Sequence, residues 1–201
     1  MMKAPDVAAL RAKFGPALER SAVSNGDHIV WVAKARAHEI LAWLKNDQGY
    51  AYLVDVTAVE YRDPELPLEV VWTVRNLKTV QELRVKVGLD PKAALAVDSV
   101  VDLWKGADWL EREVFDMFGV TFRGHPDLRR LLMWETYHEG FPLRKGFPLR
   151  GHFSRGEQTR QALAANPEAH YSIEELSIAE VYEDLPQDMR ERLARGERGD
   201  V

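Results

Sequence analysis

The stretch LEVVWTVRN, residues 68–76, decides the fold class of this sequence. Apolar side chains occupy every second position, and polar side chains lie between them except at Val71. A period of two is typical of a strand with one covered and one solvated face. Residues 82–87 repeat this alternation, and residues 50–61 are rich in Val, Tyr and Thr, which favour strands. These segments predict a mainly antiparallel sheet.

Helical patterns lie on both sides of these strands. Residues 7–14, 35–47 and 107–118 carry apolar positions at helical spacing, and a glycine follows close to the end of each segment. Residues 28–33 are a short strand candidate, and residues 91–96 are expected to form a short helical turn. Helices that cover one face of an antiparallel sheet give an α+β two-layer sandwich. We expect this fold class.

The chain changes character beyond Leu132. Five glycines and prolines fall within twelve positions, at Gly140, Pro142, Gly146, Pro148 and Gly151. Such spacing prevents a long regular element. We therefore expect an α+β domain over residues 1–135 and an extended tail over residues 136–201. Short helices are predicted in the tail after Ser172 and after Pro186.

Composition and charge exclude several functional classes. The 201 residues include 27 Lys+Arg, 32 Asp+Glu and no cysteine, and the formal net charge is −5. A chain without thiols forms neither a zinc–thiolate site nor a cysteine-ligated iron–sulfur cluster, and its mild acidity argues against nucleic-acid binding. Its apolar runs are too short to span a bilayer, and the start lacks a secretory pattern. Phosphate-binding glycine loops and the Gly-x-Ser-x-Gly elbow are missing, so we expect no cofactor in this chain.

The densest chemistry lies in residues 109–119 and 124–131. Glu113 and Asp116 are three positions apart on a predicted helix, and His125 follows the next turn. These three side chains could bind a divalent metal, although their spacing matches no standard metal motif. The alternative is a buried ionic network that makes the turn rigid. In that network Arg112, Arg129 or Arg130 pairs with Glu111, Glu113 or Asp116.

Two runs in this region form one longer pattern. Its members are Glu111, Arg112, Glu113, Asp116 and Gly119, then Gly124, His125, Pro126, Asp127, Arg129 and Arg130. This pattern resembles the signature of the 30 kDa subunit of respiratory complex I, called the C subunit in bacterial NADH-quinone oxidoreductase. Residues 52–58 resemble the family's first long strand and residues 142–149 its tail motif. The tail departs from the family at Phe141, where a histidine is expected, and at Gly146, where an acidic residue is expected.

The resemblance implies a non-catalytic scaffold subunit in the peripheral arm of a proton-translocating complex. Such a subunit packs on the forty-nine-kilodalton subunit, which lies beside the quinone site and is called the quinone-site subunit below. It supports electron transfer from NADH to quinone. FMN and iron–sulfur clusters are then expected in partner subunits. The chain itself is expected on the cytoplasmic side of the cell inner membrane, as a peripheral subunit attached through its partners only. The alternatives are the homologous subunit of a membrane-bound hydrogenase or of a quinone reductase with another donor, and a free-standing metalloenzyme that uses Glu113, Asp116 and His125.

The tail is predicted to dock on a partner. An extended segment buries little surface, so its ordering, at about 1 to 2 kcal/mol per residue, must be compensated by contacts elsewhere. Arg144, Lys145 and Arg150 alternate with apolar side chains, which predicts apolar anchors with charge at the rim. The predicted docking residues are Phe141, Pro142, Leu143, Arg144, Lys145, Phe147, Pro148 and Leu149. The alternative is that the tail wraps its own domain.

Overall fold

The computed structural model describes residues 7–63 and 66–165, which fall into two units. The first unit ends at His152, and the second begins at Phe153 and contains helix α4 (Arg155–Ala165). The first unit thus extends past residue 135, where the sequence analysis placed the end of the folded domain. The helices predicted after Ser172 and Pro186 lie outside the described residues.

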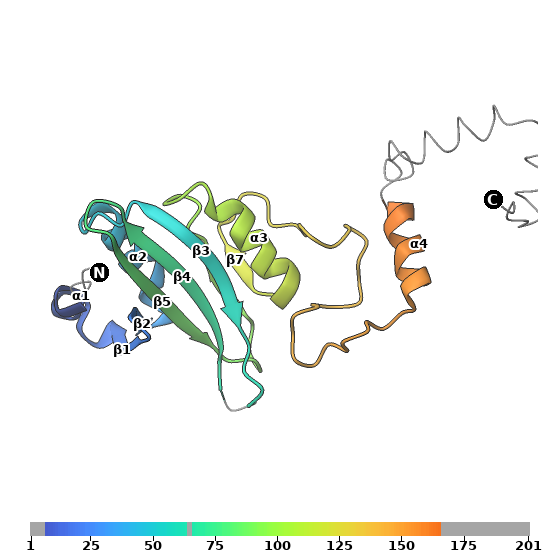
Figure 1. Cartoon of the computed structure of the whole chain (residues 1–201), viewed down its shortest axis with the longest axis horizontal. Helices are drawn as coiled ribbons and strands as arrows, with labels where there is room; N and C mark the ends of the chain where they lie inside the picture. Colours follow the sequence, from blue (N-terminus) through green and yellow to red (C-terminus); the bar gives the residue numbers. More distant parts are fainter. Residues whose placement is uncertain (1–6, 64–65, 166–201) are drawn as a thin grey trace, which may run out of the picture. The chain divides into compact units, whose positions relative to one another are not determined.

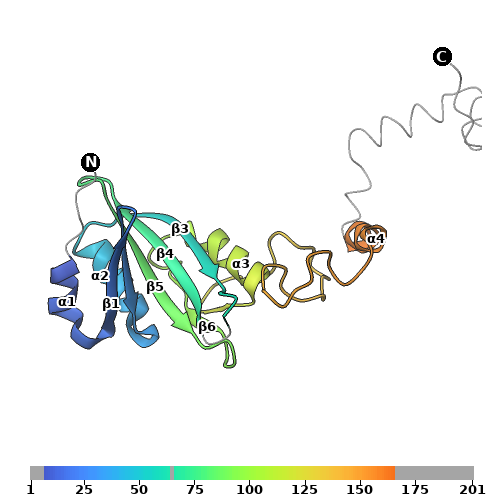
Figure 2. The ribbon, with the colours of Figure 1, turned by 60° about the horizontal axis from the view of Figure 1, so that its bottom comes forward.

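A five-stranded sheet forms the centre of the first unit, in the order β1-β2-β5-β4-β3 (Figures 1 and 2). The strands are β1 (Leu18–Ser24), β2 (Asp27–Val32), β3 (Tyr52–Val59), β4 (Leu68–Asn76) and β5 (Gln81–Leu89). Within this sheet β2 and β5 pair in parallel, and the other neighbouring strands pair antiparallel. The predicted mainly antiparallel sheet is confirmed.

Strands β4 and β5, which the alternating pattern predicted as strands, pair in an antiparallel hairpin. Their register runs from Leu68 opposite Leu89 to Asn76 opposite Gln81. The alternate positions of β4 are fully buried, as Trp72 illustrates. Val71 and Glu69 lie on the other face of β4 and are buried as well, because long side chains from neighbouring strands cover them.

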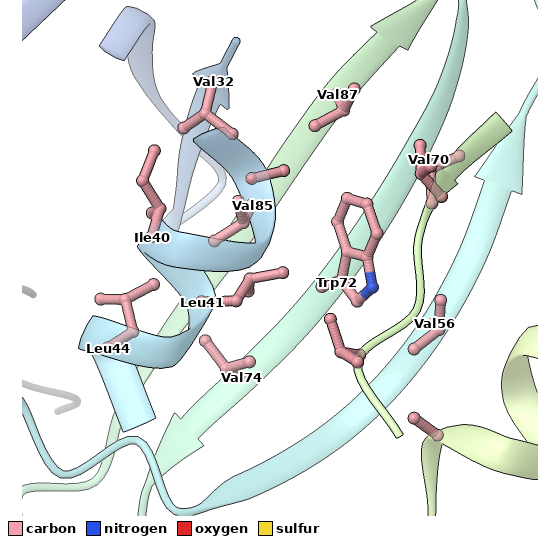
Figure 3. Close-up of a cluster of buried hydrophobic side chains, with 14 of the residues drawn as sticks. Val32, Ile40, Leu41, Leu44, Val56, Val70, Trp72, Val74, Val85 and Val87 are labelled. Atoms are coloured by element: carbon pink, nitrogen blue, oxygen red, sulfur yellow. The ribbon is translucent and has the colours of Figure 1, made fainter. Parts of the chain in front are cut away.

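The described residues of this unit form three α-helices, α1 (Val7–Phe14), α2 (Ala37–Asn46) and α3 (Ala107–Phe118), and two 3-10 helices, η1 (Gly15–Ala17) and η2 (Lys34–Arg36). Figure 3 shows Ile40, Leu41 and Leu44 of α2 pointing toward the apolar side chains of the sheet. Helix α3 packs along β3, at one edge of the sheet (Figure 1). The α+β architecture is therefore that of the prediction. No helix in the described ranges combines the length and the hydrophobicity of a membrane span.

A second, two-stranded sheet joins β6 (Ala96–Asp98) in parallel to β7 (Thr121–Arg123). The helical turn predicted at residues 91–96 is wrong. Asp90 instead closes a turn, because its side chain accepts a hydrogen bond from the N–H of Lys92 at 2.8 Å. The chain then continues into β6, which places α3 directly after it.

Candidate partner-docking site

Asp116, near the end of α3, is the centre of a buried polar cluster. Its Oδ1 accepts a hydrogen bond from Nη1 of Arg130 at 2.5 Å. Its Oδ2 accepts the consecutive backbone N–H groups of Leu131, Leu132 and Met133 at 3.1, 2.7 and 2.8 Å. Consecutive N–H groups that converge on one oxygen form an anion-binding concavity. The predicted pairing of Asp116 with an arginine is confirmed, and it holds the chain after β7 against the helix.

Arg130 links the end of α3 to the tail. Its Nη1 also donates to the carbonyl oxygen of Asp116, and its Nη2 donates to that of Gly140, each at 3.2 Å. The guanidinium lies 5.1 Å from the ring centroid of Tyr137 and 5.5 Å from that of Phe141. One partly buried cation therefore holds the residue before Phe141 in place.

Arg112 is buried as well, but it binds carbonyl groups where the sequence analysis expected a carboxylate. Its Nε donates to the carbonyl oxygen of Arg129 at 3.3 Å, and its Nη2 donates to that of Arg130 at 3.1 Å. The guanidinium also lies 5.1 Å from the ring of Trp109. Because a guanidinium carries five donors in a fixed plane, it can hold two successive peptides at once.

Glu111 connects the same helix to the segment after β6. Its carboxylate is fully buried and accepts hydrogen bonds from the Ser99 hydroxyl and the Val100 N–H, each at 2.7 Å. Burial raises the pKa of Glu111 to about 7, although these two hydrogen bonds favour the charged form. Glu113, by contrast, is exposed on α3 and lies outside the cluster. Its predicted place in the buried network is wrong, because the helix turns that position toward solvent.

His125 forms a turn that closes onto the start of α3. Its Nδ1 accepts the N–H of Asp127 at 3.0 Å, so a neutral ring carries its proton on Nε2. That Nε2 lies 3.2 Å from the carbonyl oxygen of Asp108, to which it donates. The turn also contains Gly124, at φ +81°, the exposed Pro126, and an exposed ion pair between Asp127 and Arg129 at 2.8 Å.

The proposed metal ligands Glu113, Asp116 and His125 are not brought together. Asp116 is occupied by four donors, Glu113 faces solvent and His125 is bound to Asp108. Across residues 7–63 and 66–165, no three His, Cys, Asp or Glu side chains converge in a way that suits a metal ion. These three side chains therefore do not form the common metal site that the metalloenzyme hypothesis requires.

Gly119 ends α3 in a conformation that favours glycine. Its φ is +77°, and its N–H donates to the carbonyl oxygen of Phe115 at 2.9 Å. A Cβ at this position would lie 2.5 Å from the ring of Phe141. Because Gly119 has no side chain, the helix can end in a left-handed conformation and the ring of Phe141 can pack against the same residue.

Residues 141–147 are bound to their own unit by polar contacts. The N–H of Leu143 donates to the carbonyl oxygen of Met117 at 3.1 Å. Nε of Arg144 donates to Glu60 at 2.9 Å, its Nη1 donates to the carbonyl oxygen of Phe118 at 3.2 Å, and the N–H of Lys145 donates to the second oxygen of Glu60. The alternative in which the tail wraps its own domain is correct for this part. Arg144 points inward, so its predicted place at the rim of an interface is wrong.

Both leucines among the predicted docking residues remain exposed, as do Lys145 and Pro148. Leu143 is 52% exposed and Leu149 is fully exposed, while Phe141 and Phe147 are partly buried. The ring of Phe147 lies 5.1 Å from that of His152 within the same unit. Pro142, Lys145 and Pro148 complete the segment.

A family model described as "Respiratory-chain NADH dehydrogenase, 30 Kd subunit" matches residues 30–153, which end close to the end of the first unit. The C subunit of NADH-quinone oxidoreductase from Citrifermentans bemidjiense is 39% identical over 145 residues, which are 72% of this chain and 89% of the relative. The C subunit from Geobacter metallireducens is 41% identical over 143 residues, 71% of this chain and 87% of the relative.

Two solved structures share the fold. A trypsin-resistant fragment of Nqo5 superposes with a TM-score of 0.54 at 27% identity, covering 61% of this chain and 98% of the fragment. A chain of the membrane-bound sulfane sulfur reductase, an archaeal respiratory membrane complex, superposes with a TM-score of 0.60. It is 22% identical and covers 72% of this chain and 85% of its own length, so this likeness concerns the fold alone.

Proposed function

This chain belongs to the family of the 30 kDa subunit of the respiratory-chain NADH dehydrogenase, and from that premise we propose that it is a non-catalytic scaffold subunit. It occupies the peripheral arm of a proton-translocating NADH-quinone oxidoreductase. It packs on the forty-nine-kilodalton quinone-site subunit and so supports electron transfer from NADH to quinone, with FMN and iron–sulfur clusters held by partner subunits. Its partners attach it to the cytoplasmic side of the cell inner membrane.

The observation that carries this proposal is the pair of exposed leucines on a segment whose backbone is already held. Leu143 and Leu149 face solvent, while Leu143 N–H and the Arg144 side chain are bound to the unit. Burying a leucine side chain contributes about 1.5 to 3 kcal/mol. The segment is ordered before association, so the entropy cost of ordering it does not have to be met when a partner covers it. More of the free energy of burying the leucines then contributes to binding.

Two other large apolar side chains of the first unit are also exposed. Trp109 on α3 and Leu132 are both exposed, and Leu132 is one of the residues whose N–H binds Asp116. Large apolar anchors on a rigid backbone are typical of the energetic centre of a protein interface. The buried cluster then has a structural role, because it fixes the backbone that presents these anchors.

A second candidate function concerns the electron donor of the host complex. The same fold occurs in a chain of the membrane-bound sulfane sulfur reductase, an archaeal respiratory membrane complex, so the fold alone does not decide the electron donor. In this candidate the chain is the homologous subunit of a membrane-bound hydrogenase or of a quinone reductase with another donor. The docking surface would be the same, and the set of partners would differ.

The test is purification of the affinity-tagged full chain from native membranes, followed by identification of the associated subunits. We expect the quinone-site subunit together with NADH-binding and flavin-binding subunits. A complex with a homologue of the quinone-site subunit but without the NADH-binding subunit would favour the second candidate. Purification of the chain without any such homologue would contradict both.

A further inference from the structure

Glu60, directly after β3, binds two successive residues of the tail. One carboxylate oxygen accepts Nε of Arg144 at 2.9 Å, and the other accepts the N–H of Lys145. The pair is shielded from water, since the side chain of Glu60 is 14% exposed and that of Arg144 25%. Arg144 also binds the carbonyl oxygen of Phe118 at the end of α3. The tail is thus tied to a strand and a helix at one point.

Arg144 is also the residue at which two turns of the tail meet. Its N–H donates to the carbonyl oxygen of Phe141 at 3.1 Å, and its own carbonyl oxygen accepts the N–H of Phe147 at 3.0 Å. Fixing the Arg144 side chain therefore fixes the turn that contains Leu143 and the turn that leads toward Leu149. Without Glu60, the guanidinium keeps only its bond to Phe118, and Lys145 N–H loses its acceptor.

We propose that Glu60 and Arg144 form a positioning latch, which orders residues 141–147 in the free chain and so determines where Leu143 and Leu149 meet the quinone-site subunit. This inference rests on the proposed docking function. Neither residue of the latch needs to contact the partner, because its effect is to order the segment before association. Loss of the latch transfers the ordering cost to the binding step.

The first measurement is hydrogen exchange on the full-length free chain with Glu60→Ala. We expect peptides that cover residues 141–147 to exchange about tenfold faster, as the loss of a charge-assisted hydrogen bond allows, while peptides from β4 and β5 are unchanged. Glu19→Gln is the matched control, because Glu19 is exposed on β1 at the opposite edge of the sheet from β3. Arg144→Gln is the second variant, in case Glu60→Ala does not fold.

The second measurement is the amount of quinone-site subunit recovered per tagged chain from native membranes. Glu60→Ala should lower it several-fold in the parent chain and have no further effect in a Leu143→Ala/Leu149→Ala background. A purely structural defect would lower recovery equally in both backgrounds and would overturn the latch. Unchanged exchange at 141–147, or faster exchange with full recovery, would overturn it as well. Failure of the unmutated chain to recover the quinone-site subunit would instead contradict the proposed function.

Discussion

Replacing Asp116 by alanine should destabilise the first unit more than any change on the exposed face of α3. The substitution leaves the charge of Arg130 without its carboxylate, and the side chain of Arg130 is only 15% exposed. It also removes the acceptor of three backbone N–H groups. Breaking a buried pair costs about 3 to 5 kcal/mol, and a buried donor without an acceptor costs about 1 to 3 kcal/mol more. Water can reach some of the freed N–H groups, so we predict a loss of about 4 kcal/mol.

The assay is denaturant unfolding of the full chain, with Glu113→Ala as the matched control on the same helix. Glu113 is exposed, so its removal should change the free energy of unfolding by less than about 0.5 kcal/mol. Asp116→Asn should fall between the two, because an amide oxygen in the place of Oδ2 keeps the three backbone N–H donors, while the charge that pairs with Arg130 is lost. Equal and small effects of Asp116→Ala and Glu113→Ala would refute the structural role of the cluster.

Two further substitutions and one pH profile test other parts of the account. Gly119→Ala should lower the free energy of unfolding by about 2 to 4 kcal/mol in urea titrations, because φ is +77° and the added Cβ meets the ring of Phe141, whereas Gly106→Ala, with open space at its Cβ, should have little effect. Equal effects of the two changes would contradict this packing. The pKa of Glu111 is about 7 in the folded chain against the ordinary 4.5, so the folded state binds the proton more tightly. Stability from this group is complete below pH 4.5 and is lost as the pH rises through 7, a difference of roughly 3 kcal/mol. Glu111→Gln should remove this part of the pH dependence in unfolding experiments between pH 4.5 and 8, and an identical profile for the variant would contradict it.

Local sequence patterns predicted the elements whose residues repeat with a clear period. The bounds of β4 and α3 were predicted to the residue, because β4 alternates except at Val71 and Gly119 ends the helix. Strand β1 was not predicted, since it is exposed after its first residue and so has no apolar alternation. Residues 91–96 contain a single turn, in which the N–H of Ala93 donates to the carbonyl oxygen of Asp90 at 3.1 Å, because β6 begins at Ala96 and its pairing with β7 was not predicted.

The candidate site was predicted in its residues and only partly in its contacts. The pairing of Asp116 with an arginine follows from charge and proximity in sequence, whereas Arg112 finds peptide carbonyls that composition does not indicate. Glu60 was missed because 84 positions separate it from Arg144, and no local pattern joins them. What indicates this pairing is the position of Glu60 at the end of a strand beside α3, and that position is known only once the fold is known.

The most direct test of the scaffold account is the recovery of the quinone-site subunit by a tagged Leu143→Asp/Leu149→Asp chain from native membranes. Both leucines are exposed in the free chain, so the variant should fold with unchanged circular dichroism. Leu77→Asp is the control, because Leu77 is equally exposed but lies in the turn between β4 and β5. We predict at least about tenfold lower recovery for the double variant and full recovery for the control. The double variant loses two leucine side chains that the partner would bury in the complex. Undiminished recovery by the folded double variant would contradict docking through residues 141–149.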